Sequence, residues 1–277
     1  MATFARNCRE TLGSLRTKLK GYGSVAVAFS GGVDSTLLLQ VALMTLRPGQ
    51  VLALYARSEL VKEAEQARAL MWLHSLKKRC RLRYLLIDWQ PLSIDSIRQN
   101  NEMRCYFCKQ HMFTLLQKAR EEQGMAQLLD GSNADDLLEH RPGLKAAREL
   151  AVRSPLAESG CSKACVRYLS RKLGLPTWNT PSASCLATRI PNGTALATAQ
   201  LQSVARLEAA VEGLGFPGCR VRLHSPQADS VLVELDPAHA GALADPSAQA
   251  LIRKTLMQLA VQYVSFQIAA KSRLANS

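Results

Sequence analysis

Long apolar runs are absent from this chain of 277 residues. A membrane-spanning helix needs roughly 18 or more consecutive apolar residues, and because the sequence has no such run, no membrane partner is expected. Residues 1–23 carry basic side chains but neither a continuous apolar core nor a small-residue cleavage site, so no secretory signal is expected. Together these absences predict a soluble cytoplasmic protein.

Aromatic residues are scarce too, at 5% of the chain. Proteins that bind single-stranded RNA stack bases on clustered aromatic side chains, and the sequence has no aromatic-rich basic strand, so a nucleic-acid partner is not expected. The eight cysteines are too sparse for a disulfide scaffold. In a reducing compartment they serve as buried thiols, metal ligands or nucleophiles.

Apolar content and positive charge are abundant. With 47% hydrophobic residues the chain can bury a full core, and its length predicts one large domain or a large domain with a small companion. The net charge of +13 includes a dense basic run over residues 77–83. Taken alone, this charge would favour a polyanion as partner, meaning nucleic acid or nucleotides. A solvated basic surface is the simpler explanation of the run itself.

The first half of the chain alternates short apolar runs with longer helical patterns, which is typical of an α/β fold with a parallel sheet. The apolar runs predict buried strands over residues 24–30, 51–56, 83–87 and 126–130. The segments between them predict helices over residues 35–46, 60–76 and 106–122.

The sequence pattern in the second half of the chain predicts another helical region, followed by a smaller α/β domain. A helical pattern over residues 145–174 is interrupted at Ser154 and Pro155, and a proline- and serine-rich linker follows it. Beyond the linker we expect helices over 198–214 and 248–260 and strands over 219–224, 230–235 and 263–269. The expected domains are therefore residues 1–180, a linker over 181–197, and a small α/β domain over 198–277.

The most informative stretch is Ser30-Gly31-Gly32-Val33-Asp34-Ser35, between a predicted strand and a predicted helix. Backbone N–H groups at a helix N-terminus bind anions, and glycine lets the backbone approach phosphate oxygens closely. The stretch lacks the Gly-Lys-Ser/Thr ending of a Walker A loop and the spacing of Gly-x-Gly-x-x-Gly. The alternative is an ordinary glycine turn capped by Asp34 or Ser35.

This order of strand, Ser-Gly-Gly-x-Asp-Ser and apolar helix resembles the PP-loop ATP pyrophosphatases, which have an adenine nucleotide alpha hydrolase-like fold. Those enzymes split ATP between its α and β phosphates, adenylate a carboxylate or carbonyl oxygen, and let a nitrogen or sulfur nucleophile displace AMP. The resemblance implies that pyrophosphate, with Mg²⁺ bridging its oxygens, is held by Ser30, Gly31, Gly32, Asp34 and Ser35.

Three further segments resemble one branch of that superfamily, the LarE-type sulfur transferases. They are RCYFCKQHMF at 104–113, DGSNADDLLEHRPGLKAA at 130–147, and residues 154–193, and the likeness spans most of residues 20–224. The resemblance implies that ATP is used to convert carboxylates of pyridinium-3,5-biscarboxylic acid mononucleotide into thiocarboxylates for the nickel-pincer nucleotide cofactor. It also implies a small nucleotide as the partner and a homo-oligomer as the assembly.

The cysteines leave two sources of sulfur open. In the first, a thiolate at Cys185 attacks the acyl-adenylate and later loses its Cβ–S bond, which leaves dehydroalanine on the protein. In the second, implied by family members with three cysteines, Cys105, Cys108 and Cys185 hold a [4Fe-4S] cluster whose open iron binds the sulfide to be transferred. The Cys-x-x-Cys pair alone also fits a redox dithiol, two packed thiols or a zinc site.

Other candidates for the site follow from position or from the family. Lys109 and Arg189 are cations that family members use near substrate anions, or else they are surface charges. Ligands bind at the carboxyl ends of strands in α/β sheets. The nucleotide or metal site is therefore expected to include the residues after the strand at 126–130, namely Asp130, Gly131, Asn133 and Asp135.

In the C-terminal domain, Arg220 and Arg222 alternate on a predicted strand, share a face, and resemble the family's phosphate-contacting segment. Glu208 and Glu234 are candidate metal ligands, with surface carboxylates as the alternative. After His224 the sequence lacks the arginine-containing strand expected of the family. Arg189 is followed by Ile-Pro-Asn-Gly, where family members usually have tyrosine before the glycine. These departures concern the substrate pocket and leave ATP activation unaffected.

Cys161 and Cys165 stand where the family pattern has no cysteine, so we expect packed or surface thiols there, with extra metal ligands as the alternative.

Three rival functions share the glycine loop. A tRNA thiolase would use the positive charge to bind RNA, but no RNA-binding module is recognisable. An amide-forming synthetase would need free ammonia because no glutaminase domain is present, and a nucleotide sensor would leave the cysteine motifs without a purpose.

Overall fold

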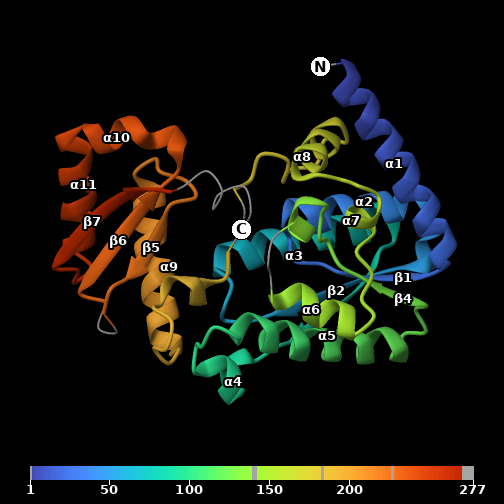
Figure 1. The fold of residues 1–277 in the computed structure, drawn as a ribbon, viewed down its shortest axis with the longest axis horizontal. Coiled ribbons are helices and arrows are strands. Elements are labelled where there is room, and N and C mark those ends of the chain that lie inside the picture. The colour runs from blue at the N-terminus through green and yellow to red at the C-terminus, as the bar shows by residue number, and fades with distance from the viewer. Residues whose placement is uncertain (1, 139–141, 182–183, 226–227, 270–277) are drawn as a thin grey trace. The chain divides into compact units, whose positions relative to one another are not determined.

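The computed structural model describes residues 2–138, 142–181, 184–225 and 228–269. The chain forms two compact units, each built from more than one segment. Unit 1 contains Met1–Ser58, Glu63–Trp89 and Cys105–Thr180, and unit 2 contains Glu59–Lys62, Gln90–Arg104 and Pro181–Ser277. Figure 1 shows the helices and strands of both. None of the described helices is long and apolar enough to cross a membrane.

Unit 1 is built around a parallel sheet of four strands in the order β3-β2-β1-β4. The strands are β1 (Val25–Ala28), β2 (Val51–Arg57), β3 (Arg83–Asp88) and β4 (Gln127–Leu129). The two central strands, β1 and β2, are buried along nearly their whole length because helices cover both faces. The predicted α/β class and parallel sheet are therefore confirmed.

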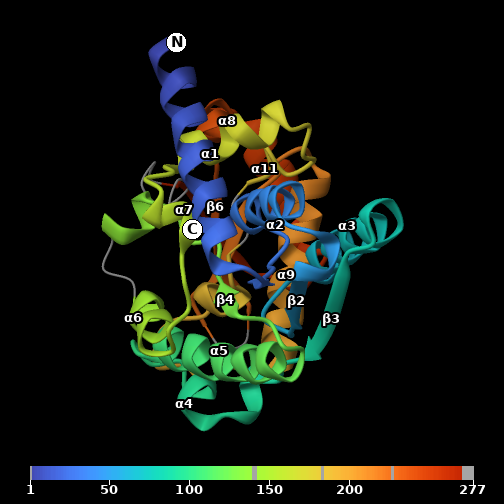
Figure 2. The same cartoon turned by 90° about the vertical axis from the view of Figure 1, so that its right-hand side faces the viewer.

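Helices cover the two faces of this sheet in separate layers (Figures 1 and 2). One face packs against α1 (Ala2–Tyr22), α2 (Val33–Thr45), α3 (Glu63–Cys80) and α8 (Lys163–Lys172). The other face packs against α5 (Arg104–Glu122) and α6 (Pro142–Glu149). Shorter elements of this unit are η1 (Pro48–Gln50), η3 (Asp135–Leu138) and α7 (Pro155–Glu158).

The long N-terminal helix α1 has no counterpart among the predicted elements. Its apolar residues recur at helical spacing at Cys8, Leu15 and Leu19, and all three are buried in the core against α2 and α8. The expected break near Pro155 is confirmed, because the helical region from 142 to 172 is divided into α6, α7 and α8.

Unit 2 contains a three-stranded sheet in the order β5-β6-β7. Strand β5 (Arg220–Leu223) runs antiparallel to β6 (Ser230–Leu235), which runs parallel to β7 (Tyr263–Ile268). Its helices are α4 (Asp95–Arg98), α9 (Thr198–Gly213), α10 (Ala240–Ala244) and α11 (Pro246–Met257). The 3-10 helices are η2 (Pro91–Ser93), η4 (Leu186–Arg189) and η5 (Pro237–His239).

Two short segments, Glu59–Lys62 and Gln90–Arg104, pack with the C-terminal part of the chain in unit 2. The amide of Leu186 donates to the carbonyl of Leu60 at 2.9 Å, and the amide of Leu196 donates to the carbonyl of Arg98 at 2.7 Å. Unit 2 therefore forms from residues far apart in the sequence.

Candidate functional site

The glycine loop, residues 30–35, connects the carboxyl end of β1 to the start of α2. Gly31 has a φ of +80°, and a Cβ there would lie 2.8 Å from the Cβ of Ala69. Gly32 is the N-cap of α2 and provides no capping side chain. The first backbone N–H groups of a helix have no partner within the helix, so the loop presents them at a position that an anion can approach closely.

Two serine hydroxyls hold the glycine loop in shape. Ser35 Oγ lies 3.0 Å from Ser30 Oγ and accepts a hydrogen bond from the amide of Ser30 at 3.2 Å. The same hydroxyl is 3.3 Å from the carbonyl oxygen of Gly32, to which it donates. The loop's own side chains thus help to hold its backbone in this conformation.

Two side chains, those of Lys163 and Asn133, contact Asp34 in the first turn of α2. Lys163 Nζ lies 2.6 Å from Asp34 Oδ2, and Asn133 Nδ2 donates to Asp34 Oδ1 at 3.1 Å. Asp135 joins the group because its Oδ2 accepts the backbone N–H of Lys163 at 2.9 Å. The structure therefore brings the predicted residues Asp34, Asn133 and Asp135 together.

Lys163 is a member of this site that sequence reasoning missed. It is the first residue of α8, directly after the N-cap Ser162. A cation at a helix N-terminus is disfavoured by the helix dipole, and a nearby anion offsets that cost. Here that anion is the carboxylate of Asp34.

The residues after β4 divide into two kinds. A Cβ on Gly131 would lie 2.9 Å from the backbone nitrogen of Ser35, so only glycine lets this segment approach the start of α2. Asp130 accepts hydrogen bonds from the hydroxyls of Ser132 at 2.8 Å and of Ser154 at 2.7 Å. Its carboxylate thus supports the backbone next to the site, whereas Gly131 and Asn133 contact residues of the glycine loop or its helix.

Cys105, Cys108 and Lys109 all lie at the N-terminal end of α5 in unit 1. The two cysteines are three residues apart on a helix, which places them on the same face. Cys105 is exposed and Cys108 is half-buried. Lys109 is exposed, and its ammonium lies 5.2 Å from the centre of the Phe113 ring.

Cys185 lies in unit 2, at the N-cap of η4, and is half-buried. Arg189, at the end of η4, has only 4% of its surface exposed. Its guanidinium donates to Thr188 Oγ1 at 2.8 Å and also to the hydroxyl of Ser184. Arg189 therefore holds residues on both sides of Cys185. Because its side chain is buried, the alternative interpretation of Arg189 as a surface charge is wrong.

Glu208 on α9 is fully buried and carries its charge between two cations. Its Oε1 accepts from Arg189 Nε at 2.7 Å, and its Oε2 lies 2.6 Å from Lys62 Nζ. Burial by itself raises the pKa of Glu208, but Arg189 and Lys62 outweigh burial and hold that pKa below its usual value. Burial opposes the charge of Lys62 too, yet Glu208 raises the pKa of that ammonium.

Arg220 and Arg222 alternate with buried apolar residues on β5 and share one face, as the sequence predicts. Arg222 Nε lies 2.8 Å from Glu234 Oε1 on β6, and its Nη1 donates to the carbonyl of Thr188 at 2.6 Å. Burial and the neighbouring arginines lower the pKa of Arg220. Glu208 and Glu234 are both buried, so the surface-carboxylate alternative is wrong for both.

A comparison with models of known protein families identifies the family of this chain. A model of the PP-loop domain matches residues 2–142, which contain the glycine loop and all four strands of the unit 1 sheet. The chain belongs to the PP-loop family. The expected resemblance of residues 30–35 to this family is therefore confirmed.

Similar proteins place the chain within one branch of the PP-loop family. It is 36% identical over 228 residues to the pyridinium-3,5-bisthiocarboxylic acid mononucleotide synthase of Lactiplantibacillus plantarum, a LarE enzyme. This match covers 82% of this chain and 80% of that protein. It is also 37% identical over 218 residues to an uncharacterised protein of Synechocystis sp., covering 78% and 76% of the two chains. The chain is thus a LarE-type PP-loop enzyme.

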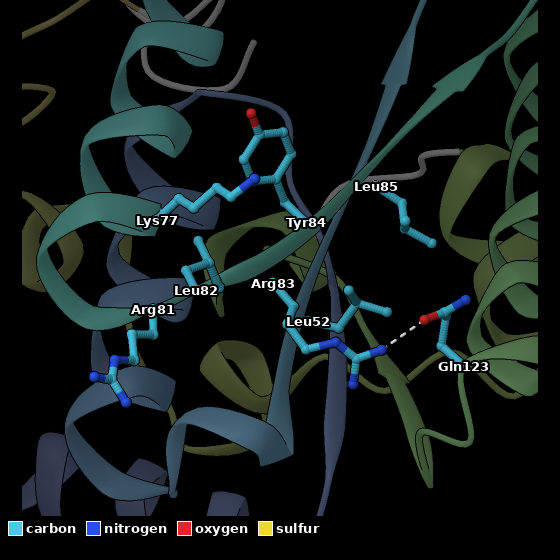
Figure 3. Close-up of a pocket in the computed structure, with 8 residues that line it drawn as sticks. All are labelled: Leu52, Lys77, Arg81, Leu82, Arg83, Tyr84, Leu85 and Gln123. Carbon is cyan, nitrogen blue, oxygen red and sulfur yellow. Dashed lines mark hydrogen bonds between the residues drawn. The ribbon is translucent and has the colours of Figure 1, made fainter.

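The basic run of this PP-loop protein lies away from the glycine loop. Lys77, Arg81 and Arg83 line a surface pocket of about 430 Å³ at the amino ends of β2 and β3 (Figure 3). The glycine loop, in contrast, follows the carboxyl end of β1. Lys77 lies 5.8 Å from the centre of the Tyr84 ring, and Arg83 donates to Gln123 at 2.6 Å. These cations therefore do not take part in the site around Asp34.

Cys161 and Cys165 of the PP-loop protein are packed thiols, as the sequence predicts. Both are buried with Cys8 in the core between α1 and α8. Burial together with Cys165 raises the pKa of Cys8 to about 12, and Cys161 together with burial raises the pKa of Cys165. The described residues of each unit contain no group of three or more His, Cys, Asp or Glu side chains arranged to hold a metal ion.

Proposed function

We propose that this chain adenylates carboxylates of pyridinium-3,5-biscarboxylic acid mononucleotide with ATP and converts them to thiocarboxylates for the nickel-pincer nucleotide cofactor. The observation that carries the proposal is the ordered glycine loop with Asp34, Asn133 and Lys163, in a chain that is 36% identical to a synthase of the bisthiocarboxylic product. The glycine loop supports ATP as one reactant, and the similarity to that synthase supports the pyridinium mononucleotide as the other.

The first half-reaction belongs to the glycine loop. A carboxylate oxygen of the substrate attacks the α-phosphorus of ATP, pyrophosphate leaves, and an acyl-adenylate forms. We propose that the N–H groups at the start of α2 bind the pyrophosphate, and that Lys163 moves from Asp34 to a phosphate oxygen as charge develops there. Asp34 and Asp135 would then be available to Mg²⁺, which prefers carboxylate oxygens.

The second half-reaction belongs to the cysteines. On the first route, the Cys185 thiolate attacks the acyl carbon and AMP leaves, giving a thioester. Removal of the Cys185 Cα proton then breaks the Cβ–S bond, so that sulfur stays on the substrate and dehydroalanine stays on the protein. This route consumes one protein molecule for each sulfur transferred.

On the second route we propose Cys105, Cys108 and Cys185 as ligands of a [4Fe-4S] cluster. The residues fit two of these ligand positions, since Cys105 and Cys108 share one face at the accessible end of α5. Such a cluster would supply sulfide as the nucleophile and leave Cys185 intact. Lys109, exposed beside the pair, is proposed to attract the anionic substrate.

We propose Arg220 and Arg222 as contacts for the substrate phosphate, with Arg189 acting through residues 184–196, which we call the Cys185 segment. A metal ion at Glu208 or Glu234 is a second hypothesis for the two carboxylates. It would have to displace Lys62 or Arg189 from Glu208, and Arg222 from Glu234. The assembly proposed is a cytoplasmic homo-oligomer that acts on a small nucleotide rather than on nucleic acid.

The test is an anaerobic assay of the full chain with ATP, Mg²⁺ and the pyridinium substrate. We expect AMP and thiocarboxylate to form together. Iron and acid-labile sulfide that disappear in Cys105→Ala, with the protein mass unchanged after turnover, would support the cluster route. A mass loss of one H₂S at Cys185 would support the sacrificial route. AMP that forms only with tRNA or only with ammonia would replace the proposal with the corresponding rival function.

A further inference from the structure

Two buried polar side chains of unit 2 hold the Cys185 segment and have no part in the chemical steps proposed above. They are Asn100, which is fully buried, and Arg104, which is 6% exposed. Asn100 has a φ of +54°, a left-handed backbone conformation that asparagine adopts more readily than most residues. This conformation directs both its backbone and its side chain to the same neighbouring segment.

The contacts of Asn100 lie beyond the C-terminal end of η4. Its Nδ2 donates to the carbonyl oxygen of Pro191 at 2.9 Å and to that of Ile190 at 3.4 Å. Its own carbonyl oxygen accepts the N–H of Gly193 at 2.9 Å. One residue thus satisfies three backbone groups of a segment that has little regular structure of its own.

Arg104 contacts the same segment inside η4. Its Nη1 donates to the carbonyl oxygen of Ala187 at 3.0 Å and also to Oδ1 of Asn100. A buried guanidinium is retained only where its N–H groups find acceptors, and here an acceptor comes from two residues after Cys185. Arg189 holds the segment through Ser184 and Thr188 by separate contacts.

The position of Arg104 in the chain adds a second constraint. Arg104 is followed directly by Cys105, and consecutive Cα atoms lie about 3.8 Å apart. Asn100 and Arg104, two of the residues that hold residues 184–196, therefore belong to the stretch that leads directly into the Cys-x-x-Cys pair. A purely apolar anchor would pack equally well but would not fix individual carbonyl groups.

We propose that Asn100 and Arg104 are positioning residues for sulfur transfer: they hold the Cys185 segment so that the acyl-adenylate is captured by sulfur rather than lost to water. This inference rests on the proposed function. It predicts that weakening the anchor uncouples the two half-reactions, because adenylation uses the glycine loop whereas capture by sulfur needs Cys185 in place.

The test measures AMP formed per thiocarboxylate formed. Arg104→Gln removes the charge, and Asn100→Asp removes the Nδ2 donor while keeping the acceptor for Arg104. Arg98→Gln is the matched control, since the Arg98 side chain is half exposed and pairs with Asp95 on its own short helix. We expect the ratio to rise about tenfold or more in both test variants, to rise less in Arg104→Lys, and to stay unchanged in Arg98→Gln.

An unchanged ratio would overturn the proposal, whether both products fall together or neither changes. General loss of folding lowers AMP and thiocarboxylate equally, so it does not imitate the expected result. If the wild-type chain forms no thiocarboxylate, the proposed function fails separately. Amide hydrogen exchange over residues 184–196 then decides the positioning role: faster exchange in Arg104→Gln and Asn100→Asp than in Arg98→Gln supports it, and equal exchange rejects it.

Discussion

The two halves of the candidate machinery are built in different ways. The glycine loop is one short stretch between a strand and a helix, and its Ser30–Ser35 contact joins residues five positions apart. The Cys185 segment contains little regular structure, and residues far away in the chain hold it in place, among them Asn100, Arg104 and Glu208. A local motif can therefore be found by inspection of the sequence, whereas a scaffold of long-range contacts cannot.

This difference in construction predicts that the stability of the Cys185 segment depends more on buried charge than the stability of the glycine loop does. Glu208→Gln keeps the shape of the side chain but leaves Lys62 and Arg189 without a buried counter-charge. We expect the free energy of unfolding to fall by about 3–5 kcal/mol, measured by urea denaturation. Glu212→Gln is the matched control, since Glu212 also pairs with Lys62 but is partly exposed, and its loss should be about 0–1 kcal/mol. Equal losses in the two variants would contradict this account.

The glycine loop should respond in catalysis rather than in stability. Lys163→Met removes the cation beside Asp34, and we expect AMP formation to fall by about 10²- to 10³-fold, measured by chromatography of the nucleotides. Lys172→Met, at the exposed C-terminal end of the same helix, should leave the rate unchanged. A normal rate in Lys163→Met would show that the ion pair with Asp34 is structural only.

Acid sensitivity should separate the two regions further. The pKa of Glu208 is lower in the folded chain than its ordinary value of 4.5, so the unfolded chain binds the proton first and stability falls as the pH falls through the folded value. We expect the melting temperature to drop on acidification below about pH 4.5, and to drop less steeply in Glu208→Gln. Parallel pH profiles for the two proteins would assign the acid sensitivity to other carboxylates.

Thiol reactivity gives the mildest test, because it compares cysteines without any substitution. Burial raises the pKa of Cys8, and Cys161 together with burial raises the pKa of Cys165. Both thiols lie in the core, whereas Cys105 is exposed. Since the thiolate is the reactive form, iodoacetamide at neutral pH should label Cys105 in the folded chain and label the other two only after unfolding. Peptide mass spectrometry would detect the order, and early labelling of Cys8 would contradict the packing described here.

The sequence predicts the parallel sheet, the glycine loop and the residues after β4 because these depend on local patterns. Strand-forming apolar runs and Ser-Gly-Gly-x-Asp-Ser carry their meaning within a few residues. The order of the strands and the close approach of Gly131 to Ser35, in contrast, are seen only in the structure. One helix, α1, is also missed, although its buried residues recur at helical spacing.

The sequence does not predict the residues that act through distant partners. Lys62 looks like one of many surface lysines, and only the fold brings it to within 2.6 Å of Glu208. Glu208 likewise looks like a carboxylate on a solvated helix face, yet it is fully buried. Asn100 carries no pattern until its left-handed backbone and its contacts with residues 190–193 are seen.

The most direct test of the account is a single-turnover reaction of the anaerobic full chain with ATP, Mg²⁺ and pyridinium-3,5-biscarboxylic acid mononucleotide, with AMP and thiocarboxylate quantified in the same sample. The account predicts one AMP for each thiocarboxylate in the wild-type chain and neither product in Asp34→Asn. AMP without thiocarboxylate, or no AMP under any condition with this substrate, would contradict it.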